Sequence, residues 1–331
     1  MNLQQIEALC GVVRNRFSIS AAAESLHRSQ PGLSRQIKEI EQELGIRVFS
    51  RTRNKVMALT PQGEEVFRIG QRVLRDIRNM QQVGSGSLRE DAGELKIATT
   101  HVHARYSLPR VIRRFSTRYP DVLLTLRQGD PVQCADLVAS GDADIGITTA
   151  ARGSEEIVAI PMYKLARSVI APRNHPLARE RNLTLRKLAG YPLVAYSASF
   201  SGRSIVDEAF ARAGLRPRVV CSAIDADVGK TYVELGMGIA ILASIAFDPA
   251  RDRNLVAMDA THLFRPGVLN LVVRKHSYLH GRALAFMALY APHVSATLIR
   301  SAMDGAEIDR QALAQKAPIA KFAESETGHE D

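Results

Sequence analysis

The sequence predicts a chain with two parts of different fold class, an all-α unit at the N-terminus followed by a larger α/β region. Up to residue 80, apolar residues recur every three or four positions, which is the period of helices that pack by one face. From residue 94 onward, strand-like runs alternate with helical segments, as in a sheet covered by helices. The stretch VGSGSLREDAG, residues 83–93, contains three glycines and separates the all-α part from the α/β part, so it marks the domain boundary.

Composition and charge narrow the class of protein. The 331 residues suffice for two or three domains, and 46% hydrophobic with 24% charged residues is typical of a globular protein. A pI near 9.8 and a net charge of +10 indicate anionic partners. The cysteines are Cys10, Cys134 and Cys221; their odd number and wide spacing argue against a disulfide framework or structural zinc, and favour buried thiols over redox sensing. No secretion signal or spanning apolar run is visible, so we expect a cytoplasmic protein with no membrane partner.

The first two helices are predicted from an apolar stripe and a cap. The stripe repeats at helical spacing over Leu3, Ile6, Cys10, Val13 and Phe17. Ser18 is the expected N-cap of a second helix, and the small side chains of residues 21–23 allow another helix to approach closely.

A third helix follows, with Ser29 as its N-cap and Pro31 in its first turn, where the missing amide costs little. Its expected buried stripe is Leu33, Ile37, Ile40 and Leu44. Its polar side carries Gln30, Ser34, Arg35 and Lys38.

The polar side of this third helix carries side chains that suit DNA. Amide and guanidinium groups pair with base edges, and hydroxyls bind phosphate oxygens, so the two short helices read as a helix-turn-helix. The alternative is a helical hairpin whose polar face only meets water, which for the pair alone is about equally good. The next stretch, IRVFSRTRNKVMALTPQG, contains two short apolar runs around a basic turn, which favours DNA. In such a β-wing, Arg51, Arg53 and Lys55 would lie on the DNA backbone.

Four motifs over about 45 residues resemble the N-terminal domain of LysR-type transcriptional regulators: Ala21–Leu26, Ser29–Ile37, Leu44–Arg51 and Leu59–Gly63. The resemblance implies a winged helix-turn-helix domain over residues 1–60 and double-stranded operator DNA as the partner, with RNA polymerase as a further candidate. The expected DNA-binding residues are Ser29, Gln30, Pro31, Ser34, Arg35, Lys38, Arg51, Arg53 and Lys55.

Residues 61–90 are predicted to form a linker helix of about 25 residues. Its apolar stripe is Val66, Ile69, Val73, Ile77 and Met80. Such a stripe needs a partner surface, either on its own chain or on a second subunit. The family resemblance favours the second subunit, hence a homodimer or homotetramer.

The α/β region, residues 91–300, is expected to form two lobes. Its strand-like runs are ELKIAT, VLLTLR, ADIGIT, RSVIAP, YPLVAY, PRVVCS and GIAILA, and parallel sheets are expected. We place a crossover at residues 165–171 and a return near Gly267, so lobe I comprises about 91–164 and 267–300 and lobe II about 165–266. This layout resembles the two-lobed, periplasmic-binding-protein-like (type 2) effector domain of the same family. The polar tail, residues 301–331, is expected to be poorly ordered or a loose helix.

Small molecules bind open α/β sheets beyond the carboxyl ends of their strands. Thr99 and Thr100 follow one predicted strand and Thr149 another, while Ser201 lies just before a helix of the second lobe. These hydroxyls suit a small anion. The alternative for the first two threonines is that they only cap a helix.

The motifs ATTHVHARYSLP, GRS-x-x-x-x-AF-x-RAGL-x-PR and DADV-x-KTYV resemble the CysB branch of the family, whose members regulate sulfur assimilation and cysteine synthesis. The resemblance implies an anionic effector, acetylserine or a sulfate- or sulfonate-like ion. The sequence differs from the branch pattern at Val102, His103, Ser201 and Ile224. The identity of the effector therefore stays open. The expected effector-binding residues are Thr99, Thr100, Val102, His103, Thr149, Ser201, Gly202, Arg203 and Asp225.

No cofactor fingerprint, phosphate loop or nucleophile motif is present, so an enzyme is not expected. His101 and His103 have a spacing that can bind metal, but no motif supplies a third ligand, so no metal is expected. The alternative function is a small-molecule receptor or enzyme of binding-protein fold with an appended helical hairpin.

Overall fold

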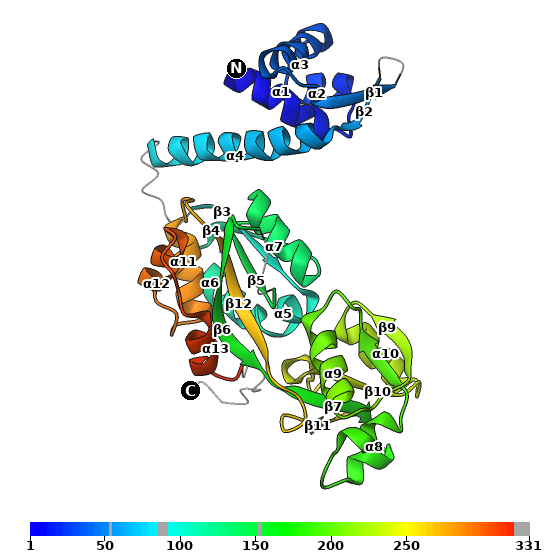
Figure 1. Cartoon of the computed structure of the whole chain (residues 1–331). Helices are drawn as coiled ribbons and strands as arrows, with labels where there is room; N and C mark the ends of the chain where they lie inside the picture. The colour runs from blue at the N-terminus through cyan, green and yellow to red at the C-terminus, as the bar shows by residue number, and fades with distance from the viewer. Residues whose placement is uncertain (53–54, 85–91, 151–153, 321–331) are drawn as a thin grey trace. The chain divides into compact units, whose positions relative to one another are not determined.

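The computed structural model describes residues 1–52, 55–84, 92–150 and 154–320 (Figure 1). The chain divides into two compact units, Met1–Leu88 and Arg89–Asp331, which are described separately. Among the described residues, no helix combines the length and the apolar character that crossing a membrane requires.

The N-terminal unit, as far as its residues are described, consists of helices and one β-hairpin. Its elements are α1 (Leu3–Arg14), α2 (Ile19–Ser25), α3 (Gln30–Leu44), β1 (Phe49–Thr52), β2 (Lys55–Leu59) and α4 (Pro61–Gly84). The predicted caps are present, since the hydroxyls of Ser18 and Ser29 accept hydrogen bonds from the amides of Ala21 and Gly32. The strands β1 and β2 pair antiparallel, as expected for a wing.

The prediction that Leu44 belongs to the buried stripe of α3 is wrong. Leu33 and Ile37 are buried, but Leu44 is 37% exposed. The helix ends at Gly45, which has the left-handed φ of 67° that terminates helices, so Leu44 lies in a final turn that leaves the core.

The apolar stripe of α4 is partly buried at one end and exposed to solvent at the other. Gly70 packs on α1, where an added Cβ would lie 3.1 Å from Ile6 and 3.4 Å from the Cys10 sulfur. Val66 and Val73 are partly buried against the same core, whereas Met80 is 72% exposed. Packing on the unit's own core therefore accounts for only part of the stripe.

The described residues of the C-terminal unit form two five-stranded sheets, one in each lobe (Figure 1). The lobe I sheet has the order β4-β3-β5-β12-β6 and the lobe II sheet the order β11-β7-β10-β8-β9. The lobe I strands are β3 (Ala92–Thr99), β4 (Asp121–Gln128), β5 (Ile145–Thr148), β6 (Ile157–Leu165) and β12 (Gly267–Arg274). The lobe II strands are β7 (Arg167–Pro172), β8 (Leu193–Tyr196), β9 (Val219–Ala223), β10 (Ile239–Ala243) and β11 (Leu255–Asp259).

Both sheets are mixed, so the expectation of parallel sheets is wrong. β12 runs antiparallel to β5 and β6, and β7 runs antiparallel to β10 and β11. The reason is topological: β6 leads directly into β7 of the other lobe and β11 leads back into β12, and these strands enter each sheet without a helical crossover. Both β6 and β11 were missing from the predicted strands, because a short apolar run without a flanking helix gives no clear period.

Helices cover the sheets of both lobes (Figure 1). Those of lobe I are α5 (His101–Tyr106), α6 (Pro109–Arg118), α7 (Pro131–Ser140), α11 (Gly281–Tyr290), α12 (Ala296–Met303) and α13 (Arg310–Lys316). Those of lobe II are α8 (Leu185–Ala189), α9 (Ser201–Arg212), α10 (Ala226–Glu234) and the 3-10 turns η1 (Pro176–Arg179) and η2 (Ser244–Ala246).

The tail up to residue 320 is more regular than the sequence suggests. The Lys164 amide donates to the Pro318 carbonyl at 2.8 Å, and the Ala320 amide donates to the Lys164 carbonyl at 2.8 Å. These bonds satisfy backbone groups of the edge strand β6. Ala317 and Ala320 are buried there, so this part of the tail belongs to lobe I.

Candidate functional site

The polar side of α3 is open to solvent. Gln30, Pro31, Arg35 and Lys38 are exposed and Ser34 is half-buried. The Arg35 side chain is 82% exposed, and its Nε donates to Glu39 one turn later at 2.8 Å. This exposed pair lowers the pKa of the Glu39 carboxyl, together with a hydrogen bond from Gln5. Because the ion pair is exposed, it leaves Arg35 able to exchange Glu39 for another acceptor at small cost.

Arg51, one of the basic residues predicted to bind the DNA backbone, has partners within the N-terminal unit. Arg51 donates to Glu41 at 2.9 Å, and Glu41 also accepts the amides of Val48 and Phe49 at 3.0 and 3.1 Å. Arg51 therefore joins the wing to α3 and has a structural role in the unit. Arg53 and the side chain of Lys55 lie outside the described residues.

Two predicted ligand residues from different lobes touch. β3 and β5 are parallel neighbours with Thr99 opposite Ile147, so Thr100 and Thr149 both follow the carboxyl ends of adjacent strands. Ser201, the first residue of α9, donates its hydroxyl to the Thr149 hydroxyl at 2.7 Å. Thr100 occupies the N-cap position of α5, but its side chain makes no cap hydrogen bond. The capping alternative therefore does not account for the Thr100 hydroxyl.

Other predicted ligand residues have structural partners. The Thr99 hydroxyl donates to the Ile147 carbonyl at 2.9 Å, and Val102 belongs to the buried core. Asp225 caps α10 by accepting the Val228 amide at 2.8 Å. Arg203 pairs with Asp207 at 2.7 Å and donates to the Tyr196 carbonyl.

His103 is buried in lobe I, where its Nδ1 lies 3.4 Å from the Ser107 hydroxyl. Burial lowers the pKa of His103 to about 4. The imidazole is therefore neutral at pH 7 and contributes no charge to a ligand.

The His103 shift predicts acid sensitivity. The unfolded chain takes up a proton near the ordinary histidine pKa of about 6.5, whereas the folded protein does so only near 4. The contribution of neutral His103 to the free energy of unfolding should thus be fully present above pH 6.5. The free energy of unfolding should fall by up to about 3 kcal/mol as the pH drops to 4. Urea denaturation at pH 7, 5.5 and 4.5 checks this, with His103→Gln expected to have a flatter pH dependence. An equal slope in both proteins would contradict it.

A network between the lobes was not foreseen from the sequence. Asp227 on α10 pairs with Arg105 on α5 at 2.8 Å, with Lys230 at 3.2 Å and with His101 at 3.2 Å, and it accepts the Tyr106 hydroxyl. Burial raises the pKa of Asp227, but the Tyr106 hydrogen bond and the Lys230 charge outweigh this effect. The pKa is therefore lowered overall, and the carboxyl is ionised. Its partners on α5 lie more than a hundred residues away in the sequence, and the motif around Asp227 drew attention only to Asp225.

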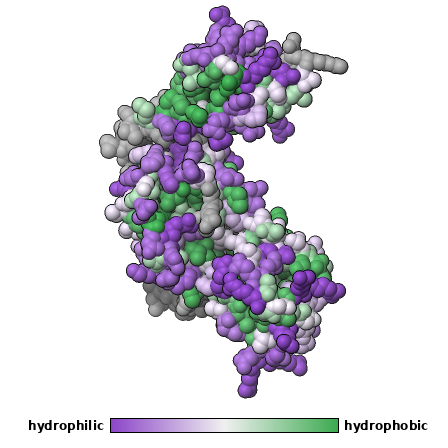
Figure 2. Space-filling model, in the orientation of Figure 1, coloured by the Kyte–Doolittle hydropathy of each residue, from purple (hydrophilic) through white to green (hydrophobic). Residues whose placement is uncertain are grey.

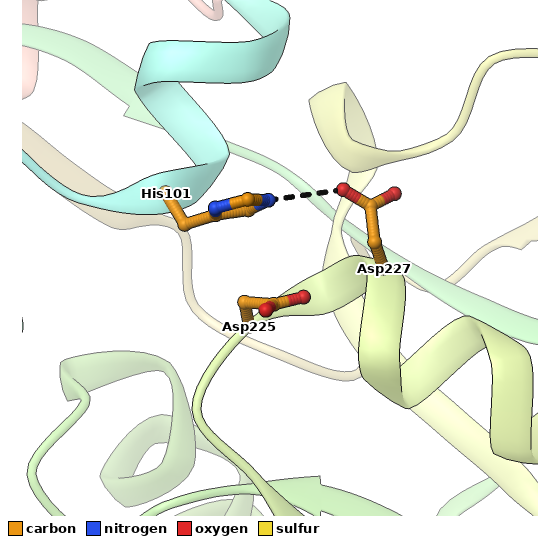
Figure 3. Close-up of side chains that lie close together, drawn as sticks. All are labelled: His101, Asp225 and Asp227. Carbon is orange, nitrogen blue, oxygen red and sulfur yellow. Dashed lines mark hydrogen bonds and ion pairs between the residues drawn. The ribbon is translucent and has the colours of Figure 1, made fainter. Parts of the chain in front are cut away.

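His101, Asp225 and Asp227 lie close together, with ligand-type atoms within 4.8 Å of one another (Figure 3). This supplies the carboxylates that the sequence did not place beside His101. Two cations, Arg105 and Lys230, already neutralise Asp227, and a divalent ion would face their repulsion. We therefore interpret the cluster as part of an ion-pair network between the lobes.

The architecture defines a class: a helix-turn-helix unit with a wing, joined to a two-lobed α/β domain, is that of a ligand-responsive transcription regulator. Residues 3–64 match the family model described as bacterial regulatory helix-turn-helix protein, lysR family, and residues 88–295 match that of the LysR substrate binding domain. The chain belongs to the LysR family of transcriptional regulators, which bind DNA and are not enzymes.

Similar proteins place it within a group of that family. The chain is 43% identical to the HTH-type transcriptional regulator SsuR of Burkholderia cenocepacia over 308 residues, which cover 92% of this chain and all of that one. Identity to CysB of the same organism is 40% over 306 residues, or 92% and 98% of the two chains. The crystal structure of the cofactor-binding domain of the Cbl transcriptional regulator superposes with a TM-score of 0.62 at 38% identity, covering 65% and 95%. This protein is thus a regulator of the SsuR, CysB and Cbl group.

Proposed function

We propose that the protein regulates genes for sulfur assimilation or for the use of alternative sulfur sources, in the cytoplasm, in response to a small anion bound between the two lobes. The observation that supports this most is the contact between Thr149 and Ser201. It joins hydroxyls from opposite lobes at 2.7 Å, beside Thr100 at the end of the neighbouring strand. Anionic sulfur compounds present several oxygens, which such hydroxyls can bind without burying many charges.

Operator binding is assigned to the polar side of α3. Gln30 and Arg35 are of the types that bind adenine and guanine edges in the major groove, and both are exposed. Ser29 and Lys38 are exposed on the same helix or at its start and would bind phosphates. The wing would supply further backbone contacts.

Dimer formation is assigned to α4. Figure 2 shows apolar surface on the N-terminal unit, and the exposed apolar side chains on α4 include Ile69 at 42% and Met80 at 72%. A second copy of α4 would cover them and would bring two α3 helices to adjacent turns of DNA.

An effector can change DNA binding only if it binds two states of the protein unequally. The Asp227 network connects α5 of lobe I to α10 of lobe II and stabilises the arrangement in which Thr149 touches Ser201. A ligand inserted between these hydroxyls would favour a different spacing of the lobes. The change would reach the DNA-binding units through the paired α4 helices.

Thr100→Val tests the ligand assignment. We expect at least about a tenfold loss of affinity for the effector, because a methyl group replaces a hydroxyl in a polar site, with unchanged affinity for DNA. Titration calorimetry with acetylserine, sulfate and methanesulfonate measures the first, and gel shifts with DNA upstream of the protein's own gene measure the second. Thr117→Val, at an exposed position on α6, is the matched control. Unchanged effector binding in Thr100→Val would show that the site is misassigned.

Mapping of bound promoters during growth on sulfate and on sulfonate tests the regulatory role. Occupancy at sulfur-source genes that changes between the two conditions is the expected result. Binding at unrelated genes only would overturn the sulfur assignment.

A further inference from the structure

Arg167 is a buried cation that has no counter-ion among the described residues. It is the first residue of β7, immediately after the chain crosses from lobe I, and only 3% of it is exposed. Its Nε has no hydrogen-bond partner, and no hydrogen bond or ion pair of its other nitrogens occurs among the described residues. An unpaired buried charge is costly, so such a group calls for a partner that binds there.

The guanidinium lies against the first turn of α9. A Cβ added to Gly202 would be 3.1 and 3.2 Å from the two terminal nitrogens of Arg167, and one added to Gly267 would be 3.2 Å from one of them. Both glycines leave the space that the guanidinium occupies. The helix α9 has 12 residues, and its N-cap Phe200 offers no side-chain acceptor for its free amides. A helix N-terminus is itself partly positive.

Electrostatics around Arg167 therefore favour an anion from two sides. Two titratable groups act on the Arg167 charge. The phenol of Tyr196 is neutral because burial raises its pKa, and Arg265 is a cation. No carboxylate is among them. Ser201, which contacts Thr149, and Gly202, which lies against Arg167, are consecutive residues of the first turn of α9.

We propose that Arg167 is the charge partner of the effector and restricts it to a tetrahedral oxyanion, a sulfate or a sulfonate group. The inference rests on the proposed effector role of the Thr149–Ser201 site. Such a group has at least three oxygens, enough to bind the guanidinium, the free amides of α9 and the two hydroxyls together. A carboxylate has only two oxygens, and a neutral ligand leaves Arg167 unpaired.

The test uses the full-length protein, with titration calorimetry of sodium sulfate and of methanesulfonate at constant ionic strength. We expect Arg167→Gln to lower sulfate affinity at least about 30-fold, and Arg167→Lys to lose less because it keeps the charge. Arg212→Gln, at a position 74% exposed in the last turn of α9, is the control and should bind normally. If methanesulfonate binds as well as sulfate, the sulfonate group suffices; if only sulfate binds, the ligand is the free ion, and either result supports the proposal.

Thermal unfolding separates ligand binding from a structural role. Sulfate should raise the Tm of the unaltered protein by mass action, but not that of Arg167→Met, whose Tm without ligand should equal or exceed that of the unaltered protein. A lower Tm of Arg167→Met together with an undiminished sulfate effect would overturn the proposal. Unchanged affinity in Arg167→Gln overturns it alone, as does binding of acetylserine with no binding of sulfate or sulfonate. Binding of none of these by the unaltered protein overturns the proposed effector site as well.

Discussion

Replacement of Lys230 by methionine is expected to lower the free energy of unfolding of the C-terminal unit by about 3–5 kcal/mol. The Lys230 side chain is only 6% exposed, and its ammonium donates to both Asp252 oxygens at 2.8 Å, to the Tyr106 hydroxyl at 2.7 Å and to the Ala246 carbonyl at 2.9 Å. Methionine fills similar space but leaves the Asp252 carboxylate without its cation. A buried carboxylate that loses its partner costs far more than the pair itself contributes.

Urea denaturation of the full chain, followed by circular dichroism, measures the loss. The control is Arg265→Met, which removes an exposed pair with Glu208 and should cost at most about 1 kcal/mol. If Lys230→Met costs no more than this control, the network between the lobes does not stabilise the unit as inferred.

Arg35→Ala should weaken binding to the operator by about 1–3 kcal/mol while affecting random DNA much less. The guanidinium is exposed in the free protein and its ion pair with Glu39 is weak, so the change should leave the fold intact. In the complex, a guanidinium that pairs with a base edge distinguishes one sequence from another. Gel shifts with the DNA upstream of the protein's own gene and with scrambled DNA of equal length measure the difference.

The matched control is Arg14→Ala, which removes the same charge from an exposed position in the last turn of α1. It should weaken binding to both DNAs slightly and equally, because only a general electrostatic attraction is reduced. Equal losses on operator and scrambled DNA in Arg35→Ala would contradict base recognition by this residue.

The N-terminal unit could be predicted from sequence because its signals are local. Ser18 and Ser29 cap the helices that follow them, and Pro31 lies in the first turn of α3, all within a few residues of the pattern that announces them. The same is true of the strand ends at Thr100 and Thr149. Their placement follows from a strand run and the residue after it.

The remaining features depend on contacts between distant segments. Asp227 meets Arg105 across more than a hundred residues, and Arg167 is buried against a helix that begins 34 positions later, at Ser201. The motif that contains Asp227 does not indicate this contact, and Arg167 lies in none of the family motifs. The mixed sheets were missed for the same reason, since the direction of β12 depends on which lobe the chain has just left.

We expect DNA, and not the protein itself, to cover the polar side of α3. Lys38 reports on this side directly because it is exposed there, and its acetylation rate can be followed by mass spectrometry in the full-length oligomer. We expect fast modification of Lys38 in the free protein and strong protection when the operator is added, with Lys187 on α8 modified equally in both. A Lys38 that is protected before DNA is added, or whose rate the operator does not change, would contradict the account.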